Sequence, residues 1–134
     1  MGIFTPPLTE SGKAEGELKN PLGIAIDKYQ NVYVADNLNN RIQKFDPEGN
    51  YLLKWGTSGD EPGQMIGPYA IAIHDDMVFV AESTNFRIQL FDLNGNYLAK
   101  VKTKPENIFF SCKGLTVDSK GDFYLSNTEM HHII

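Results

Sequence analysis

Asn31-Val-Tyr-Val-Ala-Asp36 and Arg41-Ile-Gln-Lys-Phe-Asp46 are the two stretches that decide the fold. Both return later, as Met77-Val-Phe-Val-Ala-Glu82 and Arg87-Ile-Gln-Leu-Phe-Asp92, so the arginine at position 41 recurs 46 residues on at position 87. A weaker third copy begins at Lys113. Short runs rich in β-branched and aromatic residues, repeated at this period, predict a repeat architecture made of strands.

Each full copy holds four short apolar runs, which in the first copy are residues 23–26, 32–35, 41–45 and 51–55. The first run, Gly23-Ile-Ala-Ile26, has no polar face, which predicts a strand buried on both sides. In the third run Ile42 and Phe45 are out of phase, which predicts a twist or a bulge. Turn sequences such as Asp46-Pro-Glu-Gly-Asn50 join the runs, so we expect an all-β fold of four-stranded antiparallel meanders stacked as propeller blades.

The first copy, residues 21–59, closely resembles the NHL repeat family. It contains Pro-x-Gly-Ile-Ala-x-Asp, Asn-Val-Tyr-Val-Ala-Asp, Asn-Arg-Ile-Gln-Lys-Phe, Gly-x-Tyr-Leu and Trp-Gly-x-x-Gly. The second copy departs from this pattern at His74, Glu82 and Phe86, and the third copy is weaker. NHL proteins usually form six-bladed β-propellers, so the resemblance implies about three blades here, or half a propeller. We therefore expect one NHL-repeat domain over 1–134, made of a displaced strand and loop (1–20), blade 1 (21–67), blade 2 (68–112) and a partial blade 3 (113–134).

The displaced strand follows from a second alignment. Ser11-Gly-Lys-Ala-Glu-Gly-Glu-Leu18 matches Ser58-Gly-Asp-Glu-Pro-Gly-Gln-Met65, so residues 3–8 fill the place of a fourth strand. Strands in groups of one, four, four and three then make three blades.

Two hypotheses follow. In one, two copies join head to tail as a homodimer, and residues 3–8 of each chain complete the third blade of the other to close a six-bladed ring. In the other, the chain is a fragment of a longer protein.

Composition limits the classes of function. The chain has 134 residues, a net charge of −5 and a hydrophobic content of 41%, so it is an ordinary globular sequence rather than a disordered one. The acidic balance argues against nucleic-acid binding, which needs a basic surface. No run approaches the roughly 20 apolar residues that cross a bilayer, so no membrane partner is expected. No signal peptide is seen at the first residues, and a cytoplasmic location is the expectation.

Two acid–arginine pairs recur at the same spacing. Asp36 and Arg41 lie five residues apart across one tight turn, and Glu82 and Arg87 repeat that arrangement. A carboxylate–guanidinium pair would hold such a turn shut. Because one active site rarely needs the same pair in each blade, we interpret both as structural turn pairs rather than catalytic residues.

The turns between second and third strands should share one rim with segments 10–20 and 57–67. On that rim the candidate ligand-facing residues are Asn40, Phe86 and His131. Each precedes the position that Arg41, Arg87 and His132 occupy in the three copies, and each differs where the surrounding pattern repeats. The three histidines, His74, His131 and His132, have no spacing typical of a metal site, and no cofactor is expected.

The predicted function is a non-catalytic binding or scaffold module that presents a loop face of the propeller to a protein or a small ligand. The alternative is a metal-dependent hydrolase or lyase of the six-bladed type, similar to lactonases or to the amidating lyase. No glycine-rich phosphate loop and no nucleophile elbow is present in the sequence, which favours the binding module.

Overall fold

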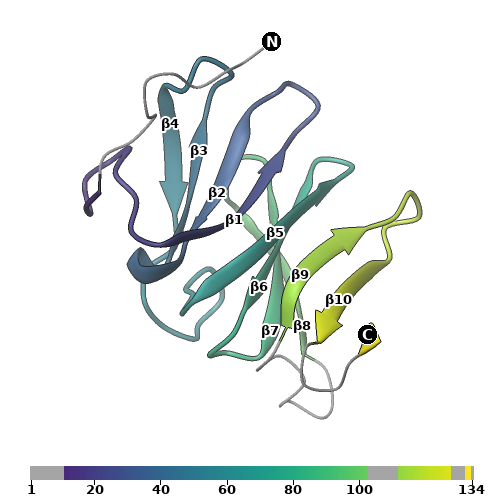
Figure 1. The fold of residues 1–134 in the computed structure, drawn as a ribbon. Helices are drawn as coiled ribbons and strands as arrows, with labels where there is room; N and C mark the ends of the chain where they lie inside the picture. Colours follow the sequence, from purple (N-terminus) through teal and green to yellow (C-terminus); the bar gives the residue numbers. More distant parts are fainter. Residues whose placement is uncertain (1–10, 103–111, 128–131, 134) are drawn as a thin grey trace.

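A computed structural model describes residues 11–102, 112–127 and 132–133. It forms three antiparallel sheets arranged as a fan (Figure 1). Blade 1 contains β1 (Pro21–Ile26), β2 (Val32–Asp36), the 3₁₀ turn η1 (Asn37–Asn39), β3 (Arg41–Phe45) and β4 (Tyr51–Trp55). Blade 2 contains β5 (Pro68–His74), β6 (Met77–Glu82), β7 (Arg87–Asp92) and β8 (Tyr97–Lys102), and blade 3 contains β9 (Cys112–Val117), β10 (Phe123–Asn127) and β11 (His132–Ile133). The prediction of all-β meander blades is confirmed. Residues 3–8, the predicted displaced strand, lie outside the described residues.

Strand pairing follows the repeat closely. In blade 1 the β2–β3 ladder runs without a shift from Val32↔Phe45 to Asp36↔Arg41. The β3–β4 ladder shifts between Lys44 and Phe45, where Leu52 of β4 is the extra residue, and blade 2 shifts at the equivalent place, between Leu90 and Phe91. The bulge therefore lies in the fourth strand and not in the third run, where it was predicted. Ile42 and Phe45 are out of phase because both faces of β3 are buried, one in the cluster between blades 1 and 2 and the other in a separate cluster of blade 1.

The core lies between the blades. One cluster joins blade 1 to blade 2 through Tyr33, Ala35, Ile71 and Phe91, and Trp55 packs against it with its ring 5.5 Å from that of Phe91. A second cluster joins blade 2 to blade 3, and its members include Phe79, Ala81, Ile88 and Leu125. Trp55 therefore packs between blade 1 and blade 2.

The inner strands β1, β5 and β9 lie side by side in the fan (Figure 1). β1 approaches β5 so closely that a Cβ added at Gly23 would lie 2.9 Å from the Cα of Ala70. Glycine at this position is therefore required by packing. No helix among the described residues is long and apolar enough to cross a membrane.

The prediction that 23–26 is buried on both sides is wrong. Ile24 and Ile26 are 65% and 56% exposed, although Ile71, the counterpart of Ile24 in β5, is only 5% exposed. The physical reason is position in the fan, because blade 1 covers this face of β5 and no described blade covers the same face of β1.

Candidate binding pocket at the inner-strand turns

The recurring acid–arginine pairs form in both complete blades. Arg41 Nε donates to Asp36 Oδ2 at 2.7 Å, and Arg87 Nε donates to Glu82 Oε2 at 2.8 Å. All four side chains are buried. Each pair bridges the turn between the second and third strands, as the sequence indicated.

Each arginine also holds the linker that precedes its blade. The Arg41 guanidinium donates to the carbonyl oxygens of Lys13, Ala14 and Glu17. In blade 2 the Arg87 guanidinium makes the equivalent bonds, to the carbonyl oxygens of Asp60, Glu61 and Gln64. This agreement confirms, atom by atom, the alignment of segment 11–18 with segment 58–65.

A glutamine completes each clamp. Gln43 Nε2 donates to the carbonyl of Glu17 at 2.5 Å, and its Oε1 accepts from the backbone nitrogen of Gly16. Gln89 makes the same two contacts with Gln64 and Gly63. Because the buried charges and amides are all paired within the protein, these clamps act as structure and leave no free polar group at their centre.

The three residues predicted to face a ligand have different surroundings. Asn40 is half-buried in a left-handed conformation (φ 52°), and its Oδ1 accepts a hydrogen bond from the backbone nitrogen of Gly67 at 3.0 Å. Phe86 is also left-handed (φ 50°) and packs against the core between blades 2 and 3. His131 lies outside the described residues. Ligand contact by these residues stays a prediction.

The opposite end of the blades carries a repeated aspartate turn. In blade 1 Asp27 Oδ1 accepts from the backbone nitrogens of Tyr29 and Asn31, and Oδ2 accepts from the Tyr33 hydroxyl at 2.8 Å. Burial opposes ionisation of Asp27, yet these hydrogen bonds outweigh it and lower its pKa. Residues 118–122 form the corresponding turn of blade 3, where hydrogen bonds led by the backbone nitrogen of Asp122 lower the pKa of Asp118.

Blade 2 departs from this turn. His74 occupies the position of Asp27, and the β5–β6 connection shortens to Asp75 and Asp76, both in left-handed conformations (φ 44° and 61°). A two-residue hairpin needs positive φ at both of its residues, which aspartate tolerates better than most side chains. The single inner turn that breaks the repeat is therefore where we look for a site.

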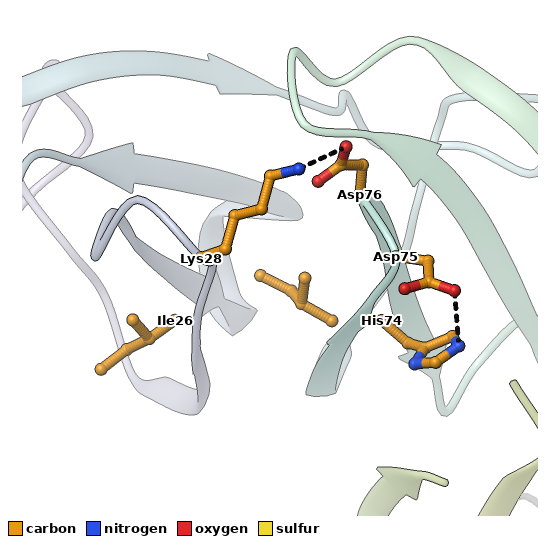
Figure 2. A pocket seen from close by; sticks show the side chains of 6 residues that line it. Ile26, Lys28, His74, Asp75 and Asp76 are labelled. Atoms are coloured by element: carbon orange, nitrogen blue, oxygen red, sulfur yellow. Dashed lines mark hydrogen bonds and ion pairs between the residues drawn. The ribbon is translucent and has the colours of Figure 1, made fainter. Parts of the chain in front are cut away.

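A pocket of about 520 Å³ lies at this turn, between the ends of β1 and β5. Figure 2 shows its polar side chains: Lys28 reaches from blade 1 to Asp76 (Nζ–Oδ2 3.1 Å), and His74 Nε2 lies 3.1 Å from Asp75 Oδ2. Ile26 and Ile73 supply its apolar lining. The hydrogen bond from Lys28 to Asp76 raises the lysine pKa, so Lys28 stays charged.

The charge of this end is acidic. Asp75 is 82% exposed at its side chain and Asp76 is 53% exposed. The surrounding turns add further carboxylates (Asp46, Glu48, Asp92, Asp118 and Asp122), against the lysines at positions 28, 44 and 120. A cationic group that enters the pocket would therefore meet carboxylates at the rim and isoleucine side chains within.

Sequence reasoning identified His74 as a departure from the repeat but did not identify Lys28, Asp75 and Asp76 as a site. The available indication was the shorter turn, since four residues separate Ile73 from Val78 in blade 2, whereas five separate the aligned Ile26 and Val32 in blade 1. No group of three metal-ligating side chains is found within residues 11–102, 112–127 and 132–133. His131 is among the residues that the structure does not describe.

Comparison with known proteins gives a family match. The NHL repeat model matches residues 18–45. Protein brain tumor of Drosophila melanogaster is 29% identical over 132 residues, which covers 98% of this chain and 13% of that protein. E3 ubiquitin-protein ligase TRIM71 of Rattus norvegicus is 43% identical over 56 residues (40% of this chain, 6% of that protein). The predicted NHL resemblance is thereby confirmed, and the chain spans only a small part of these relatives.

Two further similarities are to proteins named as lyases. The probable peptidyl-alpha-hydroxyglycine alpha-amidating lyase pgal-1 of Caenorhabditis elegans is 32% identical over 69 residues, covering 49% of this chain and 20% of that protein. Among solved structures, virginiamycin B lyase from Staphylococcus aureus superposes with a TM-score of 0.64 at 16% identity, over 84% of this chain and 36% of that one. At that identity the superposition shows a shared propeller fold alone.

Proposed function

Because this chain is built from NHL-type repeats that form propeller blades, we propose that it is a non-catalytic protein-binding module. Its binding surface is the acidic end around the pocket of Lys28, His74, Asp75 and Asp76, and its ligand is a basic segment of a partner protein. The observation that carries the proposal is the inner turn of blade 2, where two exposed carboxylates in a tight two-residue hairpin stand at a pocket that two isoleucines also line.

The chemistry of the pocket favours arginine or lysine with an apolar neighbour. Asp76 already binds an ammonium group, that of Lys28, at 3.1 Å, so the carboxylate is placed to receive a cation. An incoming guanidinium would pair with Asp75 or take the place of Lys28, while an aliphatic side chain would contact Ile73. The relatives protein brain tumor and TRIM71 are matched over only 13% and 6% of their lengths, which supports a module that serves within longer proteins.

A binding measurement tests this function. A fluorescent peptide of alternating arginine and leucine should bind to the protein by anisotropy, and its glutamate–leucine counterpart should not. Asp76→Asn should weaken binding by roughly tenfold, which is the loss of one charge-assisted contact of about 1.5 kcal/mol. Glu48→Gln is the matched control, because it makes the same charge change on an outer turn at the same end. Equal weakening by both variants, or no binding of the arginine peptide, would contradict the proposal.

A lyase activity is the second candidate, favoured by the His74–Asp75 pair and by the similarity to the amidating lyase. A histidine oriented by a carboxylate is a suitable general base. The purified protein should then convert a peptidyl-α-hydroxyglycine to the peptide amide, detected by mass spectrometry, and His74→Ala should abolish the product. Metal analysis of the same sample separates a metal-dependent lyase from a metal-free one.

A further inference from the structure

The two ends of the fan expose sheet faces whose counterparts are buried between the blades. At the blade 1 end, Ile24 is 65% exposed, whereas its counterpart Ile71 is 5% exposed. At the blade 3 end, Tyr124 is 42% exposed, whereas its counterparts Tyr33 and Phe79 are 0% and 3% exposed. The same repeat positions are thus covered inside the chain and open at both of its ends.

The internal contacts show what each face packs against. Ile71 and Ile73 of β5 pack on Tyr33 and Ala35 of blade 1. One blade further on, Leu115 and Val117 of β9 pack on Phe79 and Ala81 of blade 2. In each case branched side chains of an inner strand meet an aromatic ring and an alanine of the preceding blade.

The two kinds of face that meet in this contact are both exposed in one chain, one at the blade 1 end and the other at the blade 3 end. We call Ile24 and Ile26 of β1 the knob face. We call Gly114, Thr116, Tyr124 and Ser126 of blade 3 the socket face, whose counterparts in blade 1 are Gly23, Ala25, Tyr33 and Ala35. A hollow of about 290 Å³ lies on the socket face, and Thr116, Tyr124 and Ser126 are among its lining residues. Small residues beside an aromatic ring leave the room that isoleucine side chains fill at the internal interfaces.

We propose that the knob face of one copy docks on the socket face of a second copy, through the same contact that joins blades within the chain. A second copy is the occupant because it carries both complementary faces. Two copies related by a two-fold axis bury all four open faces, so the assembly closes after two contacts and leaves no apolar edge for further growth. The contact needs no residue outside those described, which separates it from strand exchange by residues 3–8.

The repeat also predicts where the contact ends. Leu52 on the outermost strand of blade 1 is 46% exposed, and its counterpart Leu98 is still 49% exposed although blade 2 has a blade on either side. The fourth-strand position therefore stays open when neighbouring blades are present. A docked second copy should cover Ile24 and leave Leu52 in solvent.

Light scattering after size exclusion tests the proposal on the full chain. The wild type should have twice the 15.0 kDa mass of one chain, and Ile24→Asp should have the mass of one. Leu52→Asp, which introduces the same charge at an equally apolar exposed position, should keep the doubled mass. Circular dichroism of the monomeric variant should match the wild type, since Ile24 makes no buried contact within the chain.

Mixing two damaged copies tests the direction of the contact. Thr116→Arg fills the socket face and should also give a monomer. Ile24→Asp mixed with Thr116→Arg should form a heterodimer, because the socket of the first and the knob of the second are intact. A monomeric wild type over a dilution series, a monomer from Leu52→Asp, or no heterodimer on mixing would each overturn the proposal.

Discussion

Blade 1 and blade 2 share nearly the same sequence pattern, yet they differ at their inner strands. β5 is covered by blade 1, whereas the equivalent face of β1 is open, and Ile71 and Ile24 differ twelvefold or more in exposure (5% against 65%). Their inner turns differ as well, since blade 1 closes with the aspartate turn of Asp27 and blade 2 with a two-residue hairpin of Asp75 and Asp76, both at positive φ. Contacts that a blade makes within itself recur in the next blade. Burial by a neighbouring blade, and a turn whose sequence has changed, do not recur.

Removing an arginine clamp should have the largest effect and should be the same in both blades. Arg87→Ala leaves Glu82 buried without its partner, which costs about 3–5 kcal/mol of unfolding free energy. Arg41→Ala should cost a similar amount, because its contacts are equivalent. Urea unfolding measures both, and Lys54→Ala, which removes an exposed pair with Glu15, is the control with little effect. A small loss at either arginine would show that the clamps do not hold their linkers.

Truncation of Ile24 and of its counterpart Ile71 compares an exposed face of the fan with a covered one. Ile71→Ala should lower the unfolding free energy by about 2–5 kcal/mol at every protein concentration, because it leaves a cavity in the core. Ile24→Ala should lower it only where copies associate, so its effect should fall as the protein is diluted. Thermal unfolding over a dilution series separates the two. A concentration-independent loss at Ile24 would mean that this side chain is buried within one chain.

The inner turns should differ in their response to acid. The pKa of Asp27 is lowered in the folded state, so its contribution to stability is complete above its unfolded pKa of about 3.9 and is lost as the pH falls through the folded value. Asp27→Asn should therefore destabilise the protein at neutral pH by about 1–3 kcal/mol, with a difference from wild type that shrinks below about pH 4. Urea unfolding at several pH values measures it. A difference independent of pH would assign the loss to packing instead.

The smallest expected effect concerns one position of the aspartate turn. The fourth residue of these turns has positive φ, and it is glycine in three of them (Gly49, Gly95 and Gly121). The inner turn of blade 1 has Gln30 there instead, at φ 70°. Gln30→Gly should relieve that strain and raise stability by up to about 1 kcal/mol. Gly95→Gln should destabilise, because a Cβ there would lie 2.6 Å from the Trp55 ring. Thermal melts of both variants check the pair, and a destabilising Gln30→Gly would contradict it.

Part of the candidate site could be predicted from the sequence. The substitution of His74 for aspartate and the shorter turn of blade 2 both stand in the repeat alignment. The ion pair between Lys28 and Asp76 could not be predicted, because the two residues lie in different blades and meet only when the inner strands pack side by side. Asn40 lies at the end of the blades where the linkers run, as the sequence predicts. The pocket of Lys28, His74, Asp75 and Asp76 lies at the opposite end.

The sequence by itself determined the strands and the acid–arginine pairs of Asp36 with Arg41 and of Glu82 with Arg87. These depend on alternation and on partners within one repeat and its linker, so they recur wherever the pattern recurs. Only the tertiary structure decided that Ile24 is open while Ile71 is buried. Burial of a sheet face depends on whether another blade lies over it, and an apolar strand reads the same in sequence whether that blade is present or absent.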